Sequence, residues 1–221
     1  MINYAILTFR LVWLCFPRRA RELRYQLLLK AGAKMYRKTL PYQRVPFRLY
    51  IKRSLGRVLP CNEGPALRLV EQYTDVPAPT LIDSLKTNNR TYLVVTHPPG
   101  ETLGNTMPRL TYAERSQLST DLRACISQFR KIPNPNNASI CSADGGPAFD
   151  YRLGDPAGLF DSEQAFNKHI ISQSRLRSEI HDHHPEIFFS HADLNPANIL
   201  IERGRLSGIV DFRCVKFYPE Y

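Results

Sequence analysis

The sequence lacks the features that would place it in several specialised classes of protein. Its five cysteines are odd in number and include no CxxC pair, so neither a disulfide framework nor a zinc-finger spacing is present. The one long apolar stretch, near the N-terminus, is broken by Arg10. At about 15 residues it is shorter than a membrane span requires. We therefore expect a globular protein with reduced thiols and a cytoplasmic location.

Acidic residues are almost missing from the first quarter of the chain. Residues 1–60 contain only Glu22 against 14 Lys and Arg, whereas residues 61–221 contain 19 acids against 16 basic residues. Such a basic segment can contact acidic lipids, nucleic acid or phosphates. No nucleic-acid-binding motif accompanies the charge, so we expect a solvated basic helix face and no nucleic-acid partner.

The apolar N-terminal stretch has its basic flank on the wrong side for a signal peptide, since "PRRAR" follows the stretch. We expect an amphipathic helical segment, roughly 5–31, that packs on the main body. A signal anchor, or membrane contact by residues 1–16, is the less favoured alternative.

Hydrophobic periodicity predicts the remaining elements. Gly32 is a plausible stop for a helix that begins at Arg18, Asn62 could cap a second helix, and Thr111 and Glu114 have the spacing of a capping box. Helices are predicted at 18–31, 61–74, 111–130 and 161–180, and strands at 34–40, 47–54, 91–96, 187–194, 197–202 and 206–212. Along the chain, strands with one helix come first, mostly helices follow, and a small β unit comes last. This order is not alternating βαβ, so it indicates a two-lobed α+β protein rather than a Rossmann domain.

Polar side chains gather in "SHADLNPANILIERGRLSGIVDF", residues 190–212. Asp193 follows one predicted strand, Asn198 lies five residues later, and Asp211 closes another strand. If the strand ends meet, the three side chains converge. Carboxylate and amide oxygens suit Mg²⁺ bound to phosphates, and one carboxylate can accept a hydroxyl proton. The alternative is a polar hairpin with solvated acids.

The spacing His-x-Asp-x-x-x-x-Asn followed by a strand-borne Asp matches the phosphoryl-transfer template. This region resembles the catalytic region of the aminoglycoside phosphotransferase family, which has a protein-kinase-like fold. "LPYQRVPFRLYIKR", "NEGPALRLVEQYTDVPAPTLID", "YLVVTHPPGETL" and "CSADGGPAFDYR" extend the resemblance, most closely to fungal members. It implies an α+β, bilobal protein-kinase-like fold with a β-rich N-lobe.

The resemblance implies a role for each matched residue. Asp193 resembles the catalytic base and His191 the structural histidine of the same loop. Asn198 and Asp211 resemble the Mg²⁺ ligands. Lys52 resembles the strand lysine that contacts ATP phosphates, and Glu63 its ion-pair partner. From the residues alone, Lys52 is better interpreted as a surface lysine, and Glu71 is a competing partner for the ion pair.

The same resemblance places an adenine-binding hinge at Thr96 and His97. Pro98 and Pro99 offer no N–H group there, so carbonyls or the earlier N–H groups would have to contact the base. No glycine occurs in residues 34–47, which leaves a phosphate-cradling loop unsupported. Arg37, Lys38 and Arg44 are the candidates to replace such a loop through their charge.

The family pattern continues with helices that build most of the acceptor site, whereas this sequence ends at Tyr221. We therefore expect a truncated chain with an incomplete, mainly helical C-lobe. We divide it into a basic helical segment (1–35), a nucleotide-binding N-lobe (36–97) and a partial C-lobe (98–221). "HDHHPE", residues 181–186, is interpreted as a solvated connector rather than a zinc site.

The resulting hypothesis is an ATP- and Mg²⁺-dependent phosphotransferase acting on a small-molecule hydroxyl, with its activity in doubt because of the truncation. The alternative is a catalytically dead kinase-like binding protein. A protein kinase is disfavoured because the sequence has no Gly-rich loop, no Asp-Phe-Gly triplet and no activation segment.

Overall fold

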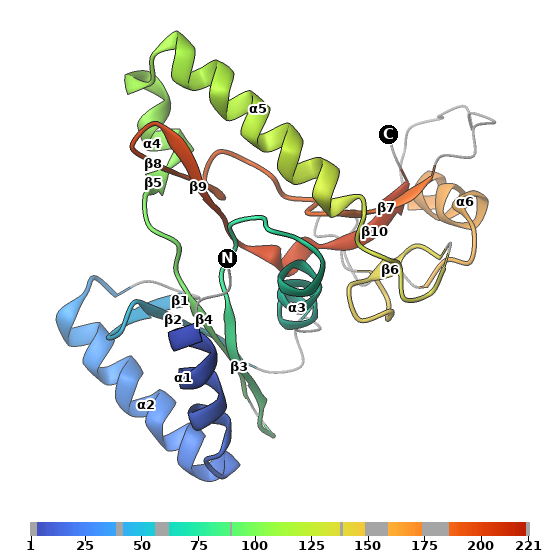
Figure 1. The fold of residues 1–221 in the computed structure, drawn as a ribbon. Coiled ribbons are helices and arrows are strands. Elements are labelled where there is room, and N and C mark those ends of the chain that lie inside the picture. Colours follow the sequence, from blue (N-terminus) through green and yellow to red (C-terminus); the bar gives the residue numbers. More distant parts are fainter. Residues whose placement is uncertain are drawn as a thin grey trace.

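The computed structural model describes residues 4–38, 42–55, 62–88, 90–137, 139–148, 159–173 and 186–219. These residues form an α+β, kinase-like fold with two lobes (Figure 1). The N-lobe comprises α1 (Tyr4–Leu14), α2 (Arg18–Met35), α3 (Glu63–Tyr73) and the strands β1 (Tyr42–Val45), β2 (Leu49–Leu55), β3 (Leu81–Lys86) and β4 (Arg90–Thr96).

The N-lobe strands form one antiparallel sheet in the order β1-β2-β4-β3. Alternation along β2 and β4 divides their side chains between two faces. One face carries Ile51 and Tyr92, which are fully buried against α2, and the other carries Lys52 and Leu93. We call these the outer and the inner face. The lysine singled out in the sequence therefore points away from the basic helices.

Helices α1 and α2 cover the outer face, as Figure 1 shows. The expected single segment 5–31 is two helices, because the chain turns at Pro17, which precedes α2. Arg21 holds α2 to the sheet through an ion pair of 2.6 Å with the buried Asp83 of β3. Trp13 of α1 stacks on Tyr25 of α2, with the ring centroids 5.7 Å apart.

Gly32 does not end α2, which continues to Met35, so the strand predicted at 34–40 is wrong for its described residues. A Cβ at Gly32 would lie 2.3 Å from the carbonyl oxygen of Arg44 on β1. Glycine at this position therefore allows α2 to approach β1 closely, and the helix tolerates the low helix propensity of glycine.

Helix α3 covers the inner face and begins at Glu63, as expected. Leu67 and Val70 form its buried stripe, whereas Tyr73, predicted to belong to that stripe, is 44% exposed. The core on this side is continuous with the C-lobe, where Phe129, Phe189, Phe212 and Phe217 join it. One hydrophobic core thus connects α3 and the inner face of the N-lobe sheet with the C-lobe.

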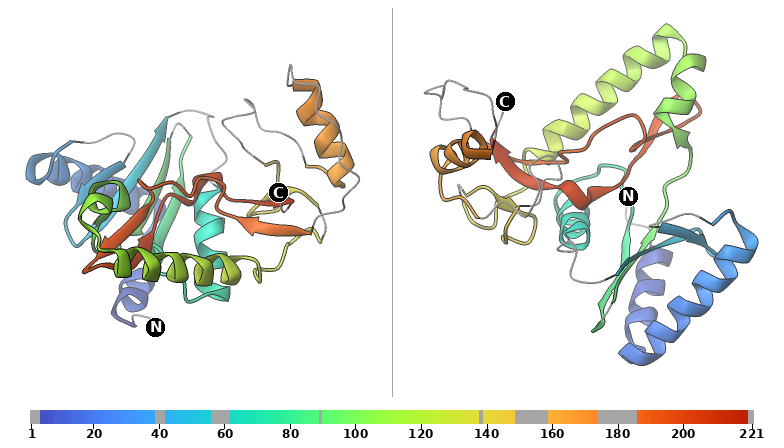
Figure 2. Two further views of the ribbon diagram at one scale, coloured as in Figure 1. Left: turned by 90° about the horizontal axis from the view of Figure 1, so that it is seen from above. Right: turned by 180° about the vertical axis from the view of Figure 1, so that it is seen from behind.

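The C-lobe contains one long helix, α5, and two small sheets in the described residues (Figure 2). Its sheets have the orders β5-β8-β9 and β6-β10-β7. The Thr111–Glu114 capping box at the start of α5 is present, as predicted. The elements are β5 (Glu101–Thr102), α4 (Leu103–Thr106), η1 (Met107–Arg109), α5 (Tyr112–Phe129), β6 (Cys141–Ser142), α6 (Glu163–Gln173), β7 (Ile187–Ser190), β8 (Ile199–Glu202), β9 (Arg205–Ile209), η2 (Phe212–Cys214) and β10 (Lys216–Pro219).

Four other expectations can be compared only with the described residues. The helix predicted at 161–180 appears as α6, and residues 174–180 lie outside the described residues, as do residues 181–185 of the histidine-rich connector. Cys15, Cys125, Cys141 and Cys214 are unpaired. No helix among the described ranges is long and apolar enough to cross a membrane.

Candidate functional site

The predicted lysine, helix glutamate and strand aspartate meet at one point. Nζ of Lys52 lies 2.7 Å from each carboxylate oxygen of Glu63 and 2.9 Å from Oδ1 of Asp211. Glu71, the competing partner, instead pairs with Arg10 of α1 at 2.8 Å. The structure therefore decides both alternatives left open by the sequence: Lys52 is not a free surface lysine, and its helix partner is Glu63.

Burial and charge together set the ionisation of this cluster. Burial disfavours the charged form of Lys52, but the carboxylates of Glu63 and Asp211 outweigh it and raise the pKa of Lys52 above its ordinary value. Burial raises the pKa of Glu63, against the opposing pull of Lys52. The ammonium therefore stays charged at neutral pH and presents a fixed positive charge between the two lobes.

The loop that follows β7 presents Asp193 between two asparagine amides. Nδ2 of Asn195 donates to Oδ1 of Asp193 at 3.1 Å, and Nδ2 of Asn198 donates to Oδ2 at 3.2 Å. Nδ2 of Asn198 also donates to the Asp193 carbonyl at 2.8 Å. These bonds fix the rotamer of the half-buried Asp193 carboxylate. Because Nδ2 of Asn198 faces Asp193 in these hydrogen bonds, the side-chain oxygen of Asn198 faces away from Asp193. That oxygen accepts no hydrogen bond from the described residues.

His191 joins this loop to the segment that carries Asp211. Its Nε2 lies 3.1 Å from the carbonyl oxygen of Val210, and its ring packs edge-on against Phe212 at 4.8 Å. Since a carbonyl only accepts, Nε2 carries the proton. Burial lowers the pKa of His191, so the ring is neutral near pH 7. The histidine thus positions both chain neighbours of Asp211, whose φ of 68° is left-handed.

Arg213 is part of the site although the sequence pattern did not select it. Its Nη2 lies 3.2 Å from Oδ2 of Asp211, so each oxygen of that carboxylate has a cationic neighbour. The donor set still fits Mg²⁺, because Asp211 and the side-chain oxygen of Asn198 are hard oxygen ligands. A metal ion at Asp211 would have to compete with Arg213. The only sequence signal was position, two residues after Asp211.

Asn62 is the second residue whose role the sequence did not reveal. It precedes Glu63 and was expected to cap α3, but its side chain makes no cap hydrogen bond. Instead Nδ2 donates to the carbonyl of Val215, and Oδ1 accepts from the backbone N–H of Ala143 at 2.8 Å. The buried amide connects the start of α3 to two segments of the C-lobe, one of them directly after Asp211.

Thr96 and His97 lie between the lobes, where the hinge was predicted. Their backbone N–H groups are already used: Thr96 donates to Thr80 at 3.0 Å and His97 to Arg48 at 3.2 Å. The His97 ring stacks on Tyr50, with the centroids 4.5 Å apart. Together with the two prolines that follow, this leaves carbonyl oxygens as the groups through which the segment can contact a base.

The cations proposed to replace a phosphate loop are dispersed. Arg44 lies over the Tyr36 ring at 4.6 Å. Lys38 lines a cavity on the outer face of the sheet, opposite Lys52. The β1–β2 turn has two residues with positive φ, Phe47 and Arg48, in place of glycine. Lys52 is on the second strand of the sheet, whereas the corresponding lysine of protein kinases is on the third.

Two comparisons with known proteins found matches for the chain. The model of the phosphotransferase enzyme family matches residues 61–220. No curated protein matches the chain. Among 59 matching chains of solved structures is a putative fructosamine-3-kinase from Haemophilus somnus 129PT, with 12% sequence identity and a TM-score of 0.51. The match covers 80% of this chain and 62% of that one. The family model covers more than half of the chain, and the chain therefore belongs to the phosphotransferase enzyme family.

Proposed function

We propose that this chain transfers a phosphoryl group from ATP to the hydroxyl of a small molecule. The observation that carries the proposal is the meeting of Lys52, Glu63 and Asp211, which come from the sheet, from α3 and from the C-lobe. Phosphoryl transfer depends mainly on positioning and on stabilisation of negative charge. A lysine held by two carboxylates at the junction of two lobes supplies both.

Asp193 is the proposed base for the acceptor hydroxyl. Its carboxylate is oriented by Asn195 and Asn198 and is half-buried beside the exposed Leu194, so an acceptor can reach it. In the proposed step the acceptor oxygen forms a bond to the γ-phosphorus while the bond to the β-γ bridging oxygen breaks. The hydroxyl proton goes to Asp193, and ADP leaves with the bridging oxygen.

Asp211 and Asn198 are the proposed magnesium ligands. When bound, Mg²⁺ would neutralise charge on the phosphates. The residues of the chain supply the rest: Lys52 contacts phosphate oxygens, Glu63 holds Lys52 in place, and His191 orients the segment around Asp211. Thr96 and His97 would contact adenine through carbonyl oxygens, since their N–H groups are engaged.

The test measures nucleotide binding and turnover separately. Calorimetric titration with ATP, with and without MgCl₂, reports binding, and release of ADP in the presence of a panel of sugars and amino sugars reports transfer. We expect Asp193→Asn to keep ATP binding and lose transfer, and Asp211→Asn to lose the dependence of ATP binding on magnesium. The matched control is the exposed Asp75→Asn. Wild-type turnover in Asp193→Asn would refute the assignment of the base.

One observation favours a second candidate, a kinase-like protein that binds nucleotide without catalysis. Arg213 pairs with the same carboxylate that would hold magnesium, and a cation there can meet phosphate oxygens without a metal ion. This candidate predicts ATP binding that is equally tight in MgCl₂ and in EDTA, with no ADP release above the rate of Asp193→Asn. Magnesium-dependent binding together with turnover excludes it.

A further inference from the structure

A cavity of 330 Å³ lies between α2 and the outer face of the N-lobe sheet. Four cationic side chains line it: Lys30 from α2, Lys38, Arg53 from β2 and Arg90 from β4. None of them makes an ion pair with any residue of the described ranges. Unpaired cations that converge on a cavity repel one another unless an anion joins them. The cavity therefore has the charge of an anion site.

The same cavity contains an unsatisfied hydrogen-bonding group. Tyr92 lines it and is fully buried, and its hydroxyl has no hydrogen-bond partner among the described residues. Buried hydroxyl groups in folded proteins nearly always have a partner, which can be a ligand or a water. Its neighbour Gln43 has its amide engaged with the carbonyls of Arg37 and Arg44, at 3.3 and 3.0 Å. Tyr92 thus places a buried hydroxyl without a partner in the wall of the cavity that the cations line.

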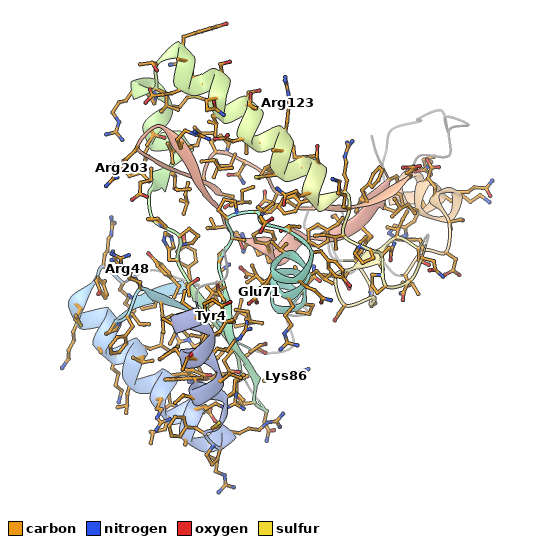
Figure 3. The ribbon with its side chains drawn as sticks, in the orientation of Figure 1. Tyr4, Arg48, Glu71, Lys86, Arg123 and Arg203 are labelled. Carbon is orange, nitrogen blue, oxygen red and sulfur yellow. The ribbon has the colours of Figure 1, made fainter. Side chains whose placement is uncertain are left out.

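A second cavity, of 550 Å³, continues from the first and shares Gln26 and Arg90 with it. It adds three more cations, Arg18, Arg19 and Lys86, against a single acid, Glu22. Figure 3 shows Lys86 at the far end of the N-lobe from Arg123 of α5. Two adjoining cationic cavities suit a ligand with more than one phosphate, because each can receive one group.

This place is separate from the phosphotransfer site. Arg53 and Lys52 are consecutive on β2, so their side chains leave opposite faces of the sheet. Lys52 meets Glu63 on the inner face, whereas Arg53 lies with Ile51 and Tyr92 on the outer face beside α2. A ligand between α2 and the sheet would be divided from the nucleotide by the sheet itself.

We propose that the paired cavities under α2 bind a ligand that carries two or more phosphate groups, with the Tyr92 hydroxyl and Arg90 as its central contacts. Such a ligand can be a soluble polyphosphorylated compound or the head group of a phosphoinositide in a membrane. Leu23 and Leu27 of α2 are 59% and 56% exposed. Leu23 lies three positions before Gln26, and Leu27 lies three positions before Lys30, so each leucine neighbours one cavity residue on the helix surface. Exposed leucines on the helix that walls the cavities favour the lipid source, because a membrane would remove them from water and a soluble ligand would not.

The experiment uses the full chain and two probes in about 150 mM salt, where screening weakens diffuse attraction between exposed charges. Inositol hexakisphosphate is titrated by calorimetry. Phosphatidylcholine vesicles with and without phosphatidylinositol bisphosphate are used for flotation.

Tyr92→Phe removes only the hydroxyl that has no partner, and we expect it to weaken binding by about fivefold. Lys30→Glu should weaken binding by tenfold or more, because it reverses a charge in the cavity, at about 1.4 kcal/mol per tenfold. Lys34→Glu is the matched control, on the same helix outside both cavities.

The possible outcomes distinguish a built phosphate site from diffuse attraction and from binding at the nucleotide site. Binding of the soluble probe that both cavity variants weaken and the control keeps establishes the site. Flotation that also needs Leu23 and Leu27, tested as Leu23→Ser with Leu27→Ser, identifies a lipid as the source. Equal losses in Lys30→Glu and Lys34→Glu, or wild-type affinity in Tyr92→Phe, would overturn the proposal in favour of diffuse attraction. Competition by excess ATP would assign the probe to the nucleotide site instead.

Discussion

Lys52 and Asp211, which are 159 positions apart in the sequence, form an ion pair with Nζ and Oδ1 2.9 Å apart. The contact joins the N-lobe sheet to the segment after the last strand of the β8–β9 hairpin. Glu63 holds the same ammonium from α3. The geometry of the site therefore depends on the relative placement of β2, α3 and the segment that carries Asp211. A substitution at Lys52 removes a contact with each of the other two elements.

Lys52→Met should lose both nucleotide affinity and stability. It leaves the Glu63 carboxylate, whose side chain is 6% exposed, without its counter-ion beside Asp211. Removing one partner of a buried ion pair costs about 3 kcal/mol. Urea denaturation measures this loss, and calorimetry with ATP measures the affinity. The exposed Lys131→Met, on the C-lobe, is the control, and equal stability of the two variants would contradict the ion-pair role.

Arg213→Ala should strengthen divalent-metal binding. The guanidinium pairs with Oδ2 of Asp211, and its removal frees that oxygen. Arg213 is half-exposed, so the pair is worth about 1 kcal/mol at most, equivalent to about a fivefold rise in metal affinity. Titration with Mn²⁺, followed by electron paramagnetic resonance, measures the change without any turnover. Arg123→Ala on α5 should behave as wild type, and an unchanged affinity in Arg213→Ala would remove Arg213 from the site.

The sequence was sufficient for the parts of the fold and site that follow from local pattern. The strands around Ile51 and Val94, the capping box at Thr111 and the spacing from Asp193 to Asn198 are all short-range signals. They predicted the α+β class and placed the 190–198 loop after a strand. The pairing of Lys52 with Glu63 rather than Glu71 required the family resemblance, because one helix carries both acids.

Other features depend on contacts between distant segments, which no local pattern records. Asn62 has a good capping residue type at a helix start, yet its amide serves Val215 and Ala143, more than 80 positions away. Gly32 resembles a helix stop, yet it is where β1 touches α2. In both cases tertiary contacts decide between two uses of one residue type.

Asn62→Asp distinguishes these two uses. Asparagine and aspartate cap helices about equally well, so a capping role predicts little change. The bridging role predicts a loss similar to that of Asn62→Ala, because the carboxylate cannot donate to Val215 and faces its carbonyl oxygen. Leaving buried backbone groups unpaired costs about 1–3 kcal/mol each. Thermal unfolding of both variants measures the loss, and a stable Asn62→Asp protein would restore the capping role.

Stability should fall as the pH drops from 7 toward 5, and His191 should account for part of the fall. Burial lowers the pKa of His191 in the folded protein, whereas an unfolded histidine titrates near about 6.5. In this window the unfolded chain binds a proton that the native protein excludes, so unfolding becomes more favourable as pH falls. Burial lowers the pKa of His97 as well, which adds a contribution of the same sign.

The measurement is the urea midpoint at several pH values in wild type, His191→Gln, His97→Gln and the double variant. Each single variant should flatten the dependence on pH, and the double variant should flatten it most. If His191→Gln keeps the full wild-type slope, His191 binds protons equally in the folded and the unfolded chain, which contradicts a lowered pKa in the folded protein.

Gly32→Ala should destabilise the protein although it improves the helix propensity of α2. In an exposed helix the change would gain about 1 kcal/mol. Here the added Cβ would lie 2.3 Å from the Arg44 carbonyl oxygen and 3.0 Å from Cγ1 of Val45, so β1 or α2 must move. Overpacking of this kind costs about 1–3 kcal/mol. Ala33→Gly, at the next and exposed position, should lose only about 1 kcal/mol of helix propensity.

Thermal unfolding of both variants tests the argument. A rise in the melting temperature of Gly32→Ala would show that α2 and β1 are not in close contact. Because the outer-face cavity is walled by the same helix, a shift of α2 in Gly32→Ala should also weaken binding of inositol hexakisphosphate.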